Sequence, residues 1–557
     1  MSALVLRTFA LFAAAAILCC QLLALQGLAA RPLHYDENEA MHASWLMAAG
    51  KTIYRDFFED HPPHLALLLE SVRPEGDLRR TDVQLWTVRA RLLAGACGVI
   101  AVGALMLLAW RMTGSYSAPI VVAATLLASS QIWARGLADI RAEAPTLALF
   151  WVGVLLLLWD RENTLGRAYR AGLGIGLLFF AAVWNPKWPL ESLLMGGLYL
   201  HVLWTMRARR RWLLAAVTPP IVLAGIALLP LFTVTNVADY LFFNFRFKAA
   251  VVSDFTANAW IVDFFRRAPV WQTASPQHRW FWIVAAMVVA AVGTRVAMPA
   301  ERRTQWMALA LCLSALLEFR FVYPYPYLWA QYLVMVATSA SLVYALLPAA
   351  VESWVARLPN GALLRPSVAI LFIVTATAFT VVALRGKAMS AFRAAPAGWT
   401  AYWDGQRRLQ ASLGPADTVW ISPPRHPVAA FDASYYWYNF RESVPSAIRE
   451  HARYPQFLPT VRFADLPPCQ TGLAEHARFL ELGDWMPFLD GVCSCAEGAF
   501  RAGALTPTRA LAIFEVGRSA PPEPEGEAWL RRTRWLWSDL CRRQQIFLQG
   551  GQLNINP

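Results

Sequence analysis

The stretch HYDENEAMHASWLMAAGKTIYRDFFEDHPPH, residues 34–64, holds six carboxylates and four histidines and is flanked by apolar sequence. Asp36 and Glu37 follow the first long apolar segment of the chain almost directly, and Asp60-His61-Pro62-Pro63 lies near the end of the stretch. Ionisable groups gathered at the edge of a membrane region usually serve a function. This stretch is therefore the first place to look for a chemical site.

The composition outside this stretch indicates a membrane protein. Charged residues make up 16% of the 557 residues, against about 25% in soluble proteins. Uncharged runs of about 20 residues, the length that crosses a bilayer, recur along the chain. We expect an α-helical polytopic membrane protein with about 11 transmembrane helices, and roughly 13 at most if the region near 236–270 contributes. The expected spans are 8–30, 90–110, 117–134, 144–159, 170–184, 188–206, 212–232, 280–298, 305–319, 327–348 and 367–384.

The basic residues predict the orientation. Arginines gather in one set of alternate loops, which the positive-inside rule places in the cytoplasm: Arg111, Arg161, Arg167, Arg170, Arg207, Arg209, Arg210, Arg211, Arg302, Arg303, Arg357 and Arg365. Arg7 then places the N-terminus inside, and an odd number of spans places the C-terminus outside. The first span is long for a cleaved signal peptide, which favours an uncleaved anchor. Because the formal charge of +13 is spread over many loops, we expect no nucleic-acid partner.

These segments predict two domains. A transmembrane domain covers residues 1–384 and includes a first periplasmic loop, 31–89; a C-terminal periplasmic domain covers 385–557. Strand-like runs at 417–422 and 511–516 indicate that the second domain is mixed α/β. An even number of cysteines in an extracytoplasmic domain predicts one or two disulfides among Cys469, Cys493, Cys495 and Cys541.

Further charged residues lie at predicted outer ends of spans. The short loop before residue 144 carries Arg135, Asp139, Arg141 and Glu143, which form either surface ion pairs or a second acidic edge facing the first. Lys187 either binds an anionic ligand or pairs with Glu191 four residues later. Arg246 and Lys248 lie among aromatic residues that suit a membrane interface, and so they could bind head groups or phosphate. Arg320 is a weaker candidate because Glu318 is close in sequence.

Four features in order resemble the GT-C membrane glycosyltransferases, which take a sugar from a polyprenyl-phosphate carrier. They are Asp36-Glu37 after the first span, Gly50 to Phe58 (similar to G-x-x-x-Y-x-D-F), His61-Pro62-Pro63, and Arg141-Ala142-Glu143 at the start of the fourth span. The protein O-mannosyltransferases show a similar Asp-Glu and Asp-x-His-Pro-Pro, and the lipid A aminoarabinose transferases share the layout. The resemblance covers about residues 1–350; the tail matches no familiar pattern.

The resemblance implies roles for these residues. Asp36 would be the general base and Glu37 would hold the geometry of the site, with Glu143 as the second acidic position, although Ala142 precedes it where the family often has proline. His61 would line the cavity, and Arg55, Asp60 and Arg141 are further candidates for substrate contacts. Lys187, Arg246 and Lys248 would bind the carrier phosphate. Some relatives use a divalent metal, and Asp36, Asp139 and Glu143 offer oxygen ligands suited to Mg²⁺ or Mn²⁺.

The function expected from this resemblance is inverting transfer of a sugar at the outer face of the cytoplasmic membrane, the inner membrane of a bacterium. The acceptor is a lipid, a glycan or a protein. Two alternatives differ in class. A lipid-linked sugar transporter or flippase would carry polar groups in the middle of its spans and often an internal repeat, which this sequence lacks. A lipid-linked glycan polymerase or ligase would often carry a large late loop, whereas here the charged motifs gather in the first loop.

Overall fold

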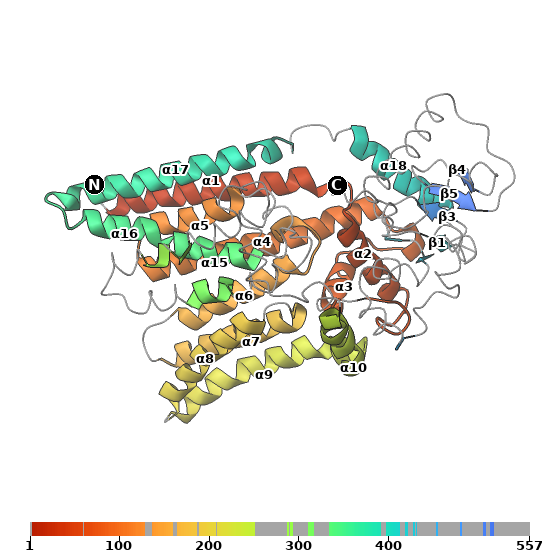
Figure 1. The fold of residues 1–557 in the computed structure, drawn as a ribbon, viewed down its shortest axis with the longest axis horizontal. Coiled ribbons are helices and arrows are strands. Elements are labelled where there is room, and N and C mark those ends of the chain that lie inside the picture. The colour runs from red at the N-terminus through yellow and green to blue at the C-terminus, as the bar shows by residue number, and fades with distance from the viewer. Residues whose placement is uncertain are drawn as a thin grey trace, which may run out of the picture. The chain divides into compact units, whose positions relative to one another are not determined.

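The computed structural model describes most of the membrane region and short parts of the tail (Figure 1). The described residues are 3–59, 61–128, 136–159, 164–186, 189–207, 209–250, 287–288, 290–292, 310–316, 334–390, 397–412, 418–420, 427–428, 430–431, 453–454, 479–481, 505–507 and 513–516. The chain divides into two compact units. The first contains residues 1–29, 90–233 and 255–394, and the second contains 30–89, 234–254 and 395–557.

The helices of the first unit overlap the expected spans wherever the structure describes them. They are α1 (Ala3–Ala29), α4 (Val83–Thr113, which begins in the second unit), α5 (Ser117–Ala128), α6 (Glu143–Leu158), α7 (Leu165–Trp184), α8 (Pro189–Met206), α9 (Arg210–Thr233), α15 (Val334–Tyr344), α16 (Leu346–Val355) and α17 (Gly361–Ser390). Among the described residues, five helices are long and apolar enough to cross a membrane: Leu4–Ala29, Val83–Thr113, Arg210–Thr233, Val334–Val355 and Gly361–Met389. The expected polytopic helical membrane protein is confirmed. The expected spans 280–298 and 305–319 lie largely outside the described residues.

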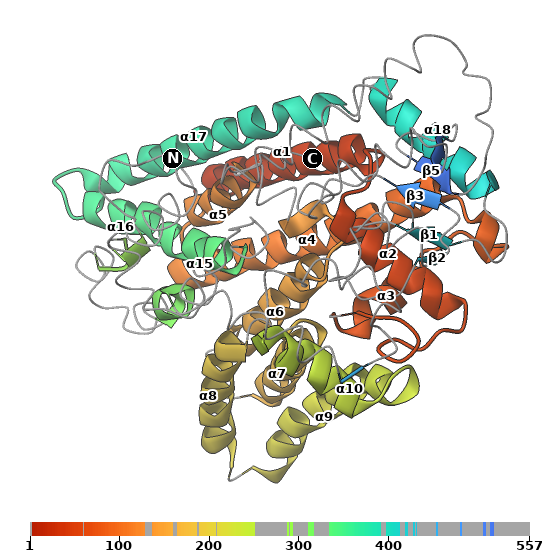
Figure 2. The ribbon, with the colours of Figure 1, turned by 45° about the vertical axis from the view of Figure 1, so that its right-hand side comes forward.

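The outer surfaces of these helices are apolar, as contact with lipid requires. On α17, Leu363 is 77% exposed and Val382 is 70% exposed, and Phe12 on α1 and Phe232 on α9 are exposed as well. Such surfaces are rare on soluble monomers, but they suit lipid chains. Helices α1 and α17 run side by side along one edge of this unit (Figures 1 and 2).

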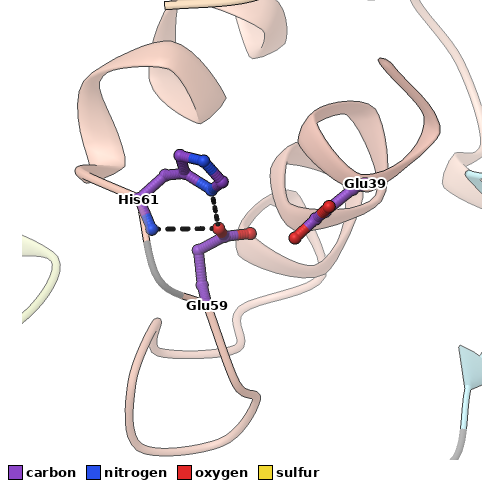
Figure 3. Close-up of side chains that lie close together, drawn as sticks. All are labelled: Glu39, Glu59 and His61. Carbon is purple, nitrogen blue, oxygen red and sulfur yellow. Dashed lines mark hydrogen bonds and ion pairs between the residues drawn. The ribbon is translucent and has the colours of Figure 1, made fainter. Parts of the chain in front are cut away.

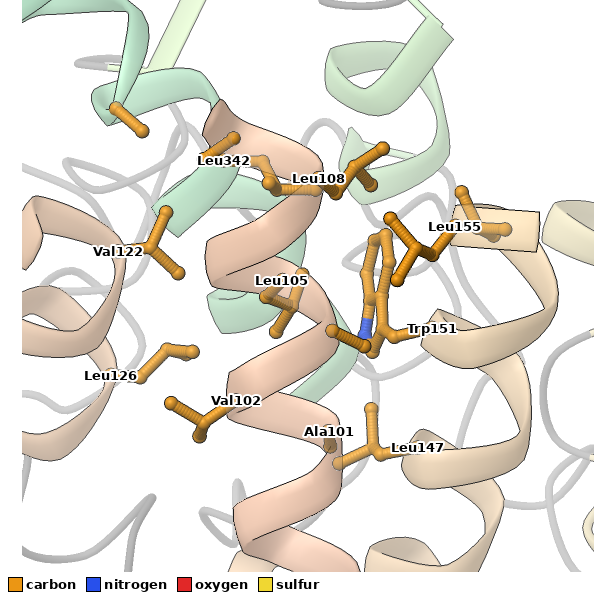
Figure 4. Packing of buried hydrophobic residues seen from close by; sticks show 14 of the residues in the cluster. Ala101, Val102, Leu105, Leu108, Val122, Leu126, Leu147, Trp151, Leu155 and Leu342 are labelled. Carbon is orange, nitrogen blue, oxygen red and sulfur yellow. The ribbon is translucent and has the colours of Figure 1, made fainter. Parts of the chain in front are cut away.

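The interior of the first unit is a continuous apolar core. Leu105 and Leu108 of α4 pack with Leu126 of α5, Trp151 of α6 and Leu342 of α15 (Figure 4). All five side chains are almost completely buried. Because lipid is as apolar as this core, tight packing of surfaces contributes more to association of the helices than removal from water does.

Glycines allow α7 to approach two neighbours closely. A Cβ atom at Gly172 would lie 2.1 Å from the carbonyl oxygen of Ala216 on α9, and one at Gly174 would lie 2.6 Å from the carbonyl oxygen of Gly153 on α6. The Ala216 carbonyl has no helical donor because Pro220 lacks an N–H. The hydroxyl of Tyr199 on α8 donates to it instead, at 2.9 Å, so this polar group is satisfied inside the apolar bundle.

The second unit gathers the first loop, residues 234–254 and the tail. Its elements are α2 (Tyr35–Ala48), α3 (Pro63–Glu70), η1 (Leu78–Arg80), α10 (Val237–Leu241), the π-helix η3 (Phe242–Phe247) and α18 (Ala397–Ser412). The expected division into a transmembrane domain, 1–384, and a tail domain, 385–557, stays a prediction; by their contacts, residues 30–89 group here with residues 395–557. The physical reason is direct bonding: Trp403 Nε1 of α18 donates to the Ala30 carbonyl at 2.7 Å, and Gln410 Nε2 donates to the carbonyls of Arg79 and Thr81.

The tail contains a five-stranded mixed sheet with strand order β2-β1-β3-β5-β4. The strands are β1 (Thr418–Trp420), β2 (Ala430–Phe431), β3 (Phe479–Glu481), β4 (Leu505–Pro507) and β5 (Ile513–Val516). β1 pairs in parallel with β2 and β3, while β5 is antiparallel to β3 and β4. β1 and β5 are the two strands expected from sequence, so the prediction of a mixed α/β tail is confirmed. The four tail cysteines lie outside the described residues.

The close contact of α7 with α9 makes a prediction. Gly172→Ala should lower the free energy of unfolding by about 1–3 kcal/mol, because its Cβ would overlap a backbone oxygen that cannot move independently of α9. The measurement is thermal unfolding of the purified protein in detergent. Gly225→Ala on α9 is the matched control, since no atom lies within 4 Å of its added Cβ; equal midpoints for the two variants would contradict the packing.

Candidate functional site

Glu37 holds the start of α2. The backbone N–H of His34 donates to Glu37 Oε2 at 2.9 Å, and Arg31 NH2 lies 3.8 Å from Glu37 Oε1. This is the bond of the third helical residue back to the N-cap that stabilises many helix starts. The side chain of Glu37 is fully buried. Its geometry suits a positioning role, as the resemblance implies.

Asp36 is the accessible carboxylate of the pair. Its side chain is 21% exposed, and Asp36 Oδ2 lies 3.8 Å from His34 Nδ1. The first turn of α2 favours a negative charge here through the helix dipole. A carboxylate that is fixed at a helix start but reachable from outside can accept a proton from a bound hydroxyl or amine.

The other end of α2 is closed by Gly50. The N–H of Lys51 donates to the Leu46 carbonyl at 3.0 Å and that of Gly50 donates to the Met47 carbonyl at 2.9 Å. This is a Schellman motif, which needs a left-handed residue after the helix, and Gly50 has φ +82°. The glycine of the 50–58 motif therefore stops α2 and turns the chain into the following loop.

Tyr54 anchors that loop. Its hydroxyl donates to the His61 carbonyl at 2.6 Å and accepts from Asn244 Nδ2 at 2.8 Å. Its ring is fully buried and stacks on Phe243, with centroids 5.1 Å apart. Tyr54 has φ +68°, a left-handed conformation that is strained for a bulky residue. The two hydrogen bonds and the stacking hold the backbone in it.

The π-helix η3 supplies the surface on which Tyr54 rests. Phe58 of the loop meets Phe243 and Phe247 edge to face, both with centroids 5.5 Å apart. Tyr454 of the tail also packs on Phe243, with centroids 4.7 Å apart, and donates to Asp239 Oδ1 at 2.9 Å. Burial and the Asp239 carboxylate raise the pKa of Tyr454, so its hydroxyl remains a donor. Single π-helical turns are frequent at functional sites.

Arg55 and Asp56 form the exposed tip of the same loop. Arg55 Nε donates to Asp56 Oδ1 at 3.0 Å, and the Thr52 N–H donates to Asp56 Oδ2 at 2.7 Å. The Arg55 side chain and the Thr52 N–H lower the pKa of Asp56 to about 2. The Arg55 side chain is thus engaged by its neighbour, and its expected contact with substrate stays a prediction.

His61 is drawn into a cluster with two glutamates (Figure 3). Its Nδ1 lies 2.6 Å from Glu59 Oε1, and its backbone N–H donates to the same oxygen at 3.1 Å. Glu39 of α2 directs its carboxylate toward this pair, and single ligand atoms of the three residues all lie within 4.8 Å of one another. The expected contact of His61 with substrate stays a prediction.

The two basic residues after α10 differ in exposure. Arg246 is exposed within η3, beside exposed Phe245, and Lys248 is half-buried just after it. An exposed cation beside an exposed aromatic ring is typical of the membrane interface. This arrangement fits the expected binding of an anionic head group.

The remaining expected residues belong to the first unit or lie outside the described part. Arg141 Nε is 3.3 Å from Glu143 Oε2, and Glu143 and Asp139 are buried. The ion pair expected as one alternative therefore exists, but it is buried rather than on the surface. Outside the described residues lie Asp60, Arg135, Lys187 and Arg320. The metal set Asp36, Asp139 and Glu143 draws on both units and stays a prediction.

Four residues of the second unit have no role predicted from sequence: Asn244, Glu39, Glu59 and Tyr54, the last of which is the tyrosine of the 50–58 motif. Asn244 has a signal, because it is the one amide in the aromatic run Phe242 to Phe247. Glu39 and Glu59 have only a weak signal, the spacing of Glu59 two residues before His61. Their proximity depends on how the loop folds back on α2, which local sequence does not specify.

Comparisons with known proteins identify the fold. No protein-family model and no curated protein matches the chain. Among solved structures, ArnT from Cupriavidus metallidurans in the apo state aligns with 15% identity and a TM-score of 0.50, over 90% of this chain and 97% of that one. The same protein bound to undecaprenyl phosphate aligns with 16% identity and a TM-score of 0.49, over 92% and 99%. The chain therefore has the fold of ArnT.

The hydrogen bonds of Tyr54 make a second prediction. Tyr54→Phe should lower the free energy of unfolding by about 1–3 kcal/mol, because it removes a partner from the His61 carbonyl and from the Asn244 amide. Thermal unfolding is the measurement, with Tyr169→Phe on the exposed face of α7 as the control. A midpoint for Tyr54→Phe no lower than that of the control would show that the hydroxyl does not hold the loop.

Proposed function

We propose that this chain is an inverting glycosyltransferase that moves a sugar from a polyprenyl-phosphate donor to an acceptor, with Asp36 as the general base. The observation that carries the proposal is the contrast between the two adjacent carboxylates. Glu37 is fully buried and bonded to the start of α2, whereas Asp36, on the same helical turn, is accessible. Glu37 thus stabilises the helix start on which Asp36 lies.

The fold supports the same proposal. The chain shares the fold of ArnT, a lipid A aminoarabinose transferase of the GT-C class, and it carries the Asp-Glu and His-Pro-Pro motifs in the order found in GT-C enzymes. ArnT also has a solved structure with undecaprenyl phosphate bound. We infer a polyprenyl-phosphate sugar as the donor class, with transfer at the outer face of the cytoplasmic membrane, the N-terminus inside and the tail in the periplasm.

The reaction is a single displacement. The acceptor oxygen or nitrogen attacks the anomeric carbon, the bond from that carbon to the phosphate oxygen breaks, and the lipid phosphate leaves with the electron pair. Asp36 takes the acceptor proton. A phosphate is already a good leaving group, so cations that stabilise its charge contribute more than an acid would. Arg246 and Lys248, in the same unit as Asp36, are the proposed phosphate ligands.

The base assignment predicts that Asp36→Asn lowers the rate of sugar transfer by about 10²–10⁴-fold, the usual contribution of a general base. The assay uses membranes with matched expression and a panel of labelled polyprenyl-phosphate sugars. Asp77→Asn is the control, because Asp77 is also an aspartate at a helix start in the first loop, where it accepts from the Arg79 N–H. Full activity of Asp36→Asn would move the role to another carboxylate, with Glu143 the next to test.

The phosphate assignment predicts a different kinetic effect. Arg246→Gln should raise KM for the donor about tenfold or more, since a hydrogen bond to a charged group contributes about 1.5–3 kcal/mol, and should change kcat much less. Lys51→Gln, which removes an exposed cation from the first loop, is the control. An unchanged KM in Arg246→Gln would exclude this residue from donor binding.

A further inference from the structure

The cluster of Glu39, Glu59 and His61 has a composition that the proposed reaction does not use. It combines two carboxylates with an imidazole, which distinguishes it from an ordinary acidic patch. One ligand atom from each residue lies within 4.8 Å of the other two. We propose that these three side chains form a binding site for a divalent transition-metal ion.

The geometry requires only a small adjustment to admit the ion. Metal bonds of about 2.1 Å to oxygen and nitrogen join ligand atoms up to about 4.2 Å apart. Glu59 Oε1 and His61 Nδ1, now 2.6 Å apart, would open slightly as the ion replaces the proton between them. The Glu39 carboxylate already faces Glu59, and a change of its side-chain rotamer would bring it within bonding distance of the ion (Figure 3).

Electrostatics favours a cation at this point. Carboxylates whose oxygens lie this close repel each other when both are ionised. The Glu59 side chain is only 6% exposed, so water screens that repulsion poorly. A divalent ion between the two carboxylates neutralises both charges. The His61 side chain is 40% exposed, which leaves a path for the ion to enter from solvent.

The ligand chemistry selects the class of metal. Imidazole suits Zn²⁺ and the other first-row transition ions, whereas Mg²⁺ and Ca²⁺ prefer sites made wholly of oxygen. Three protein ligands leave at least one position for water, as in many zinc sites. This set shares no residue with the predicted set Asp36, Asp139 and Glu143.

The ion would also have a structural effect. Glu39 lies on α2, one turn after Asp36, while Glu59 and His61 lie in the loop before α3. Bound metal would therefore cross-link the helix that carries Asp36 to the loop that Tyr54 anchors. This inference does not depend on the proposed sugar transfer, because its readout is metal binding.

The test is metal content and affinity of the full chain in detergent, purified through a tag without histidines. The protein is stripped with chelator, then given Zn²⁺ or Mn²⁺, with Mg²⁺ as a comparison, and bound metal is measured by mass spectrometry after desalting. Wild type should retain Zn²⁺ or Mn²⁺ at about one equivalent. Glu39→Gln and His61→Asn should each bind at least about tenfold more weakly.

Two controls make the result decisive. Glu70→Gln removes a carboxylate of the same unit that pairs instead with Arg73 at 3.0 Å, and it should bind metal like wild type. Thermal unfolding of each variant without metal shows whether it is folded, and added Zn²⁺ should raise the midpoint of wild type but not of Glu39→Gln. Failure of wild type to retain either transition ion, or equal retention by folded Glu39→Gln, would overturn the proposal.

Discussion

The buried hydroxyl of Tyr54 connects the first loop of the second unit to the π-helix η3. It bonds to the His61 carbonyl on one side and to the Asn244 amide on the other, and its left-handed backbone places it where both are within reach. Such a conformation costs about 1–3 kcal/mol in a tyrosine. That strain persists because the ring is also enclosed by Phe243 and its neighbours, so the loop and the π-helix define each other's position.

The carboxylates of the first loop show how environment separates chemically identical groups. Glu37 is enclosed and bonded to the backbone, Asp56 is held by an arginine at an exposed turn, and Glu59 is buried beside an imidazole. Asp36 differs from these three because it combines a fixed place in the first turn of a helix with a partly exposed side chain. In the sequence all four are simply acidic residues, whereas the folded loop gives each carboxylate a different exposure and different partners.

Much of the architecture can be predicted because it depends on local patterns. Long apolar runs predict the helices of the first unit, and short β-rich runs predict β1 and β5. The end of α2 follows from Gly50. What sequence does not predict depends on contacts between distant segments, such as Tyr54 with Asn244 or Trp403 with Ala30.

The close packing of α7 limits how the helices of the bundle can move relative to one another. Gly172 contacts the backbone of α9 while Gly174, two residues later, contacts that of α6. Each residue advances a helix by about 100°, so a rotation of α7 by one residue would drive a larger side chain into one neighbour. Helices α6, α7 and α9 are therefore constrained to shift together as a rigid block. The short link Val234-Thr235-Asn236 that follows α9 lies outside this block, so the constraint set by the two glycines ends before it.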